Sequence, residues 1–222
     1  MKSRTFTAAL GLFLAAAPLG ATEDKVSLTH RYVEGEQSRY KIEFSMDQGG
    51  NPVQITGEVL LTIKKTLDDG GADFEMKIEK FESPMGIDGT GTFKSKFDKF
   101  GMSPDLETRD QAVLLVIYSI CNYLPKDEVT LGKVFPIDWK SGGSGLTVKG
   151  EGTVDSAKPG DDGKTKIRYG LEVTPPGDTP GKVTSTSTFL TKTGKLLEST
   201  GTVVISDGTA SFKITRLPDK KS

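Results

Sequence analysis

The stretch "GEVLLTIKKTLDDGGADFEMKIEKF", residues 57–81, contains two runs in which apolar and polar residues alternate. The apolar positions of these runs are Val59, Leu61, Ile63, Phe74, Met76 and Ile78. Alternation with a period of two is typical of a strand with one buried face, because successive side chains point to opposite faces. Between the runs, "DDGG" at 68–71 favours a tight turn, since Gly accepts positive φ. The stretch therefore predicts a β-hairpin.

The same alternation recurs on both sides of this hairpin. It appears upstream in "RYKIEFSM" at 39–46 and downstream in "GTGTFKSKF" at 89–97. Residues 146–173 alternate in the same way around a second turn signal, "DDGK" at 161–164. The last strand-like runs are "KVTSTSTFL", "KLLESTGTVVI" and "TASFKITRL". They are rich in Ser and Thr, so we expect one face of their sheet to meet water.

One segment departs from this pattern. "TRDQAVLLVIYSICNYLP", residues 108–125, is an apolar run that Thr108 can cap, with Gln111 as its capping-box partner. Pro125 would end a helix. The apolar side chains would point in all directions around the axis, whereas a surface helix shows only a stripe. The sequence therefore predicts a helix over 108–124 that is covered on more than one side.

These patterns together predict a mainly β fold. We expect an antiparallel curved sheet or half-barrel of about ten strands with one central buried α-helix. Residues 22–222 would form a single β-rich domain. Within it, two meanders, 26–104 and 146–217, would be joined by the helix 108–124. The helix would lie on the concave side of the sheet.

The first 21 residues resemble a secretory signal peptide. Lys2 and Arg4 precede a short apolar run at 8–19, and Ala21 suits a cleavage site. Removing the two cations takes the formal net charge from −1 to −3. This weak, evenly spread charge does not favour binding to nucleic acid. We expect an exported protein, periplasmic or extracellular, with no integral membrane segment after signal cleavage.

Residues with catalytic or metal-binding chemistry are sparse. His30 is the only histidine and Cys121 the only cysteine, too few for a zinc site built from these residue types. No G-x-S-x-G motif accompanies His30, for which we expect a solvated role. Cys121 is either a buried structural thiol or a reactive one. We therefore predict no enzymatic activity, no catalytic residues, no metal and no cofactor.

The apolar run leaves two interpretations open. The helix either fills the core or lines an apolar cavity for a lipid-like ligand, and burial favours both equally. In the second case the ligand-binding residues would be Val113, Val116, Ile117, Ile120, Phe93, Phe97 and Phe189. The function predicted on this basis is non-catalytic binding in the cell envelope. The alternative is a structural or protein-interaction module with a fully packed core and no ligand.

Three segments carry a family resemblance. They are "LTHRYVEGEQSRYKIEF" at 28–44, "LPKDEVTLGKVFPIDW" at 124–139 and "STFLTKTGKLLEST" at 187–200. They resemble the opening, middle and closing elements of an uncharacterised secreted bacterial β-rich family, the DUF6263-like group. The middle element departs from that pattern, with Phe135 at its aromatic position and Trp139 later. The resemblance implies a β-rich envelope protein and, by a more distant fold analogy, envelope lipid or lipoprotein carriers.

Overall fold

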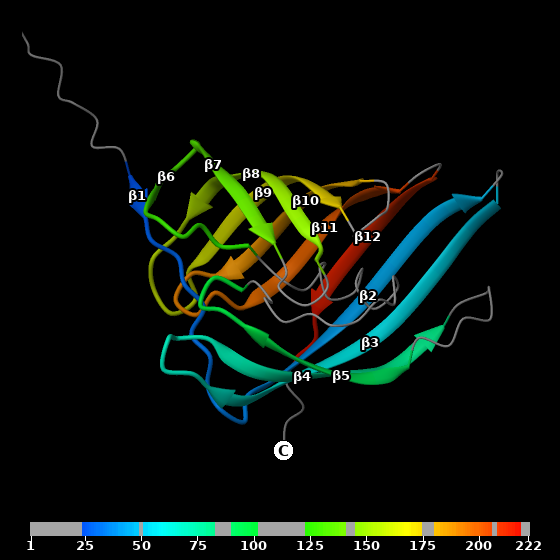
Figure 1. The fold of residues 1–222 in the computed structure, drawn as a ribbon, viewed down its shortest axis with the longest axis horizontal. Helices are drawn as coiled ribbons and strands as arrows, with labels where there is room; N and C mark the ends of the chain where they lie inside the picture. Colours follow the sequence, from blue (N-terminus) through cyan, green and yellow to red (C-terminus); the bar gives the residue numbers. More distant parts are fainter. Residues whose placement is uncertain are drawn as a thin grey trace, which may run out of the picture.

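The computed structural model describes residues 24–48, 51–82, 90–101, 123–140, 145–174, 180–205 and 208–218. This part of the chain forms twelve strands in two antiparallel sheets (Figure 1). The strands are β1 (Lys25–Val26), β2 (Gln37–Gln48), β3 (Asn51–Thr66), β4 (Ala72–Glu82), β5 (Gly91–Phe97), β6 (Val129–Thr130), β7 (Val134–Lys140), β8 (Thr147–Ala157), β9 (Lys164–Thr174), β10 (Gly181–Leu190), β11 (Leu196–Ile205) and β12 (Gly208–Arg216).

The larger sheet has ten strands in the order β5-β4-β3-β2-β12-β11-β10-β9-β8-β7. Neighbouring strands of this sheet are consecutive along the chain except at the centre, where β2 pairs with β12 and aligns Phe44 with Phe212. The outermost strands, β5 and β7, are not paired with each other among the described residues, so the sheet is not a closed barrel. It bends so that β5 and β7, its outermost strands, face each other across its concave face (Figure 1).

The alternation in the sequence is confirmed by burial. Tyr40, Ile42 and Phe44 of β2 are buried on the concave face, and the residues between them are more exposed. The β3–β4 hairpin is also confirmed, with Ile63 opposite Phe74. Its turn is held by the backbone N–H of Gly71, which donates to Asp69 Oδ1 over 2.9 Å.

The prediction of a central buried helix was wrong. The described residues contain strands, turns and irregular segments but no helix, and they hold twelve strands in two sheets. Residues 108–122 of the expected helix lie outside the described part. Its last two residues, Tyr123 and Leu124, are buried in an irregular segment. The Leu124 N–H donates to the carbonyl of Phe100 over 3.0 Å, a long-range bond in place of a helical one.

Residues that lie directly opposite each other on neighbouring strands point to the same face of the sheet. The concave face therefore consists of rows of side chains that cross the strands. One row runs through Phe135, Gly152, Tyr169, Ser185, Gly201, Phe212, Phe44 and Ile55. Two of its glycines leave room for a neighbouring ring. A Cβ on Gly152 would come within 2.2 Å of Phe135, and one on Gly201 within 2.8 Å of Phe212. Rings therefore fill the space above the glycines in this row.

Charged pairs occupy the convex face of β2–β4. Arg39 lies 2.6 Å from Glu79, and Lys80 lies 2.8 Å from Glu58. On the convex face of β10–β12 Thr and Ser are frequent, whereas β8 and β9 carry mainly charged side chains there, with Arg168 paired to Asp155 over 2.8 Å. The smaller sheet pairs β1 with β6, aligning Val26 with Val129.

Candidate functional site

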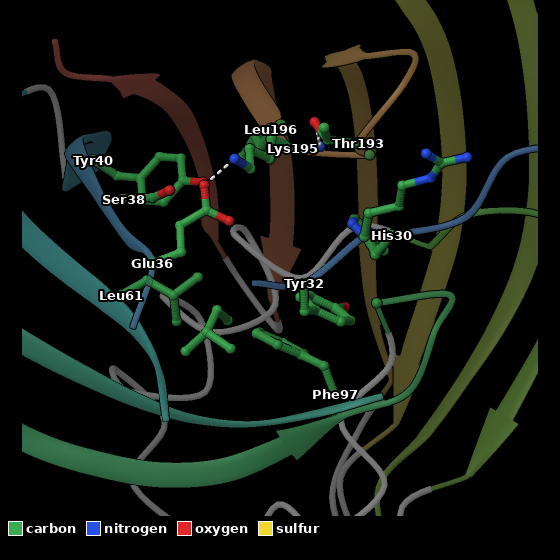
Figure 2. Close-up of a pocket in the computed structure, with 14 residues that line it drawn as sticks. His30, Tyr32, Glu36, Ser38, Tyr40, Leu61, Phe97, Thr193, Lys195 and Leu196 are labelled. Carbon is green, nitrogen blue, oxygen red and sulfur yellow. Dashed lines mark hydrogen bonds and ion pairs between the residues drawn. The ribbon is translucent and has the colours of Figure 1, made fainter. Parts of the chain in front are cut away.

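A short irregular segment, residues 28–36, connects the two halves of the large sheet at one end; we call it the strap. The backbone N–H of His30 donates to the carbonyl of Lys99, just after β5, over 2.9 Å. The N–H of Arg31 donates to the carbonyl of Thr193, just before β11, over 3.0 Å. The strap therefore connects segments that lie far apart in the strand order of the sheet (Figure 2).

The strap needs a glycine on the β11 side. Gly194 has a φ of +66°, which side-chain-bearing residues adopt only at a cost. A Cβ there would lie 2.7 Å from His30 Nδ1 and 3.0 Å from the carbonyl oxygen of Thr29. The close approach of the strap to the β10–β11 turn therefore depends on a residue without a side chain.

An ion pair joins the end of the strap to the start of β11. Lys195 Nζ donates to Glu36 Oε1, and the two side chains are only 23% and 20% exposed (Figure 2). Partial burial strengthens such a pair compared with one in open solvent, because screening is weaker. The Glu36 carbonyl also accepts from the N–H of Ile63 over 2.9 Å. Glu36 therefore ties the strap to both β3 and β11.

Stacked rings connect the strap to the β4–β5 side of the core. His30 stacks on Tyr32 with 5.5 Å between ring centroids, and Tyr32 stacks on Phe97 at 5.8 Å. Phe97 stacks in turn on Phe74 at 3.9 Å. The Tyr32 hydroxyl donates to the carbonyl of Asp98 over 3.1 Å. His30 is therefore half-buried in an irregular segment, and its ring packs against another ring.

A small cavity of about 50 Å³ lies between the strap and the concave face. Its walls combine apolar and polar side chains: Tyr40, Leu61, Ile63, Phe97, Leu196, His30, Arg31, Tyr32, Glu36, Ser38, Thr193 and Lys195, with Gly101 and Gly194. One water needs roughly 10–15 Å³ by this kind of measure, so the cavity has room for about three to five waters. It suits water or a small polar group and is too small for an acyl chain.

Burial on the concave face of the described strands decreases toward the end opposite the strap. Six apolar residues there are only partly buried, and we call them the apolar rim: Met46, Val53, Phe81, Phe93, Val173 and Val183. They come from six different strands, β2, β3, β4, β5, β9 and β10. At the strap end, by contrast, Ile63, Phe74 and Phe189 are at most 5% exposed. Among the described residues, the partly buried apolar side chains of the concave face thus lie mainly at the rim end, and Leu61 at the strap end is partly buried as well.

The predicted ligand-binding residues fall into three groups. Phe97 lines the strap cavity, and Phe93 belongs to the apolar rim. Phe189 is 1% exposed and opposes Leu196, which also lines the cavity. Val113, Val116, Ile117 and Ile120 lie outside the described residues.

Sequence reasoning missed the residues of the strap. Glu36 and Lys195 are 159 positions apart, so no local motif could pair them. The one available signal was that residues 28–36 break the alternation seen in the following strand. Such a break indicates an irregular segment, but it does not reveal what the segment contacts.

Tyr169 is a strongly perturbed titratable group of the core. Its hydroxyl donates to the carbonyl of Tyr123 over 2.9 Å inside the core. Burial raises the pKa of the Tyr169 phenol well above its usual range, because the phenolate would lose its solvation. Tyr169 therefore stays protonated in the folded protein at physiological pH and holds Tyr123 in place.

This arrangement predicts a specific stability profile in alkali. The phenol ionises near pH 10 in the unfolded chain and only at higher pH in the folded one, so rising pH favours unfolding. We expect Tyr169→Phe to cost about 1 kcal/mol at pH 7 through the lost hydrogen bond. Above pH 10 the wild type should lose that advantage, by up to about 1.4 kcal/mol per pH unit. Urea unfolding of both proteins at several pH values measures this; a constant difference up to pH 11.5 would contradict it.

No known protein family, curated protein or solved structure matches this chain. Within the described ranges, no three His, Cys, Asp or Glu side chains are grouped to hold a metal ion. The same ranges contain no helix long and apolar enough to cross a membrane.

Proposed function

We propose that this protein is a non-catalytic, exported binding protein of the cell envelope that holds an apolar, lipid-like ligand against the concave face of its sheet. The observation that supports the proposal is the contrast between the two ends of that face. The strap and the ion pair Glu36–Lys195 cover one end. At the other end, the apolar rim stays partly exposed on six strands.

The energetics of the rim favour an apolar occupant. Apolar area removed from water contributes roughly 25 cal/mol per Å². A ligand that covers part of the rim therefore gains free energy without any directional contact, and specificity for a headgroup is not required. Among the described residues, the edge strands β5 and β7 do not pair with each other, so the sheet is not closed into a barrel.

The alternative function is a structural or interaction module without a ligand. One observation favours it: between the two ends, concave-face residues such as Ile42, Ile214 and Phe212 are already buried. A face that is covered throughout its middle would need no further occupant. The two functions differ in whether the rim end takes up an apolar molecule.

Two valines on opposite faces of the sheet allow a matched test. Val183 belongs to the apolar rim, whereas Val204 on the adjacent strand is 41% exposed on the convex face. Lysine can be accommodated at both positions, because a partly exposed site lets the ammonium reach water. We expect Val183→Lys to reduce co-purified lipid, and uptake of a radiolabelled sixteen-carbon fatty acid, at least tenfold. Val204→Lys should bind like the wild type.

The measurements are native mass spectrometry and organic extraction of the purified protein, with circular dichroism to establish that each variant is folded. Folded wild-type protein that carries no lipid and takes up no fatty acid would overturn the proposal in favour of the interaction module. Equal uptake by wild type and Val183→Lys would also overturn it, since the rim would then not be the site.

A further inference from the structure

The convex face of β8–β11 contains a shallow depression of about 700 Å³ that the proposed function does not use. Its floor consists of two parallel rows of side chains, each crossing four strands in register. One row is Glu151, Gly170, Thr184 and Thr202, and the other is Thr153, Arg168, Thr186 and Thr200. With strands about 4.8 Å apart, each row is about 14 Å long.

Most of the floor is made of short side chains, with Glu151 and Arg168 as the exceptions. Gly170 faces outward with no side chain at all, and a Cβ placed there would meet nothing within 4 Å. Five threonines surround it, whereas the next row outward carries Glu172 and Lys182. The floor thus combines hydroxyls with one acid and one cation, and further charged side chains stand beside it.

The hydroxyls can bind a ligand as well as one another. Thr184 Oγ1 and Thr202 Oγ1 are 2.7 Å apart and share one hydrogen bond. Each hydroxyl has one donor and two acceptor lone pairs, so the pair keeps one donor and several lone pairs for other partners. The site also holds a positioned cation, because Arg168 Nε donates to both oxygens of Asp155 over 2.8 Å.

The side chains and backbone of the floor disfavour nucleic acids, protein interfaces and added peptide strands as ligands. Its one cation, Arg168, is already paired with Asp155, and Glu151 adds a further acid, so the net positive charge on which nucleic-acid binding depends is missing. No large apolar side chain faces outward in the two rows, so the apolar centre of a protein interface is missing as well. The backbones of β9 and β10 are paired on both sides, so a peptide cannot add as a strand.

A neutral ligand rich in hydroxyl groups is compatible with the side chains of this floor. We propose that the depression is a binding site for an uncharged glycan chain, held by the threonine hydroxyls and oriented by Glu151 and Arg168. Hydroxyl groups on both partners can alternate as donor and acceptor, which neither an apolar nor a charged ligand can match. No aromatic ring faces outward on the floor, so binding rests on hydrogen bonds and is weak for a short oligomer. This site is on the opposite face of the sheet from the proposed lipid site and does not depend on it.

The test uses two neutral oligosaccharides as probes, a tetramer of β-1,4-linked glucose and a tetramer of N-acetylglucosamine. We expect at least one probe to shift backbone amide NMR signals at 151–153, 168–170, 184–186 and 200–202, with a Kd of roughly 1 mM. Gly170→Tyr should weaken binding at least tenfold, because the ring fills the floor at a position that tolerates a Cβ. The double variant Thr184→Val and Thr202→Val should do the same by removing two hydroxyls without changing strand propensity.

The matched control is Thr92→Val and Thr209→Val, two exposed threonines of β5 and β12 outside the depression. It should bind the probe like the wild type. If neither probe shifts these amide signals at concentrations up to about 10 mM, ten times the expected Kd, the proposal is overturned. So would binding that survives both Gly170→Tyr and the Thr184/Thr202 double variant in folded protein, since the glycan would then lie elsewhere.

Discussion

Phe74→Ala is expected to lower the free energy of unfolding by about 3–5 kcal/mol, the usual loss for a buried phenylalanine. The side chain is 2% exposed, and its ring stacks on Phe97 with 3.9 Å between centroids. Tyr32 of the strap stacks in turn on the Phe97 ring. The cavity left by the missing ring would therefore loosen both the core and the strap above it. Urea unfolding followed by Trp139 fluorescence measures the loss.

Phe93→Ala provides the control for this change. Phe93 is also an inward-facing phenylalanine of the same half of the sheet, but it is only partly buried. Its removal should cost less than half as much, because less apolar area returns to water. Equal losses in the two variants would mean that the core is not more tightly packed at the strap end than at the rim.

The second large effect is expected for Gly201→Ala, at about 2–3 kcal/mol of destabilisation. The added Cβ would lie 2.2 Å from the carbonyl oxygen of Thr184 and 2.8 Å from Phe212 Cζ. A backbone oxygen in a paired strand cannot move without disturbing the β10–β11 ladder, so the clash is relieved only by a shift of the strands. The loss should appear as a lower urea midpoint at unchanged slope.

Gly170→Ala is the matched control on the next strand but one. Nothing lies within 4 Å of the position that a Cβ would take there, so the native state accepts the methyl group. The substitution should be neutral or stabilise by about 0.4–1 kcal/mol, because alanine restricts the unfolded chain more than glycine does. If Gly201→Ala proved as harmless as Gly170→Ala, the concave row that contains Phe212 would have to be more loosely packed than its contacts indicate.

The strands themselves could be predicted from local pattern. In β2, β4 and β9 the alternation identified the buried face correctly, because the period of two follows from the pleat of a single strand. The β3–β4 hairpin was also predictable, since "DDGG" at 68–71 is a local turn signal. The helix over 108–124 was not a sound prediction. An apolar run indicates that residues are buried, and Tyr123 and Leu124 are buried without a helix.

The candidate sites were less predictable than the strands. Of the residues proposed for ligand binding, only Phe93, Phe97 and Phe189 lie in the described ranges, and they occupy the rim, the strap cavity and the core. In the sequence, the threonines of the convex face are visible only as a polar composition. Their arrangement into two rows depends on the register of four strands, which no single strand specifies.

The sequence by itself determined which segments are strands, which face of each is apolar and where the tight turns fall, because those properties depend on neighbours within a few residues. Only the tertiary structure decided that β2 meets β12, that Glu36 meets Lys195 and that rings occupy the space above Gly152 and Gly201. These contacts join residues far apart in the chain. They form because the sheet bends and packs as a whole, and many different long-range pairings satisfy the same alternating pattern.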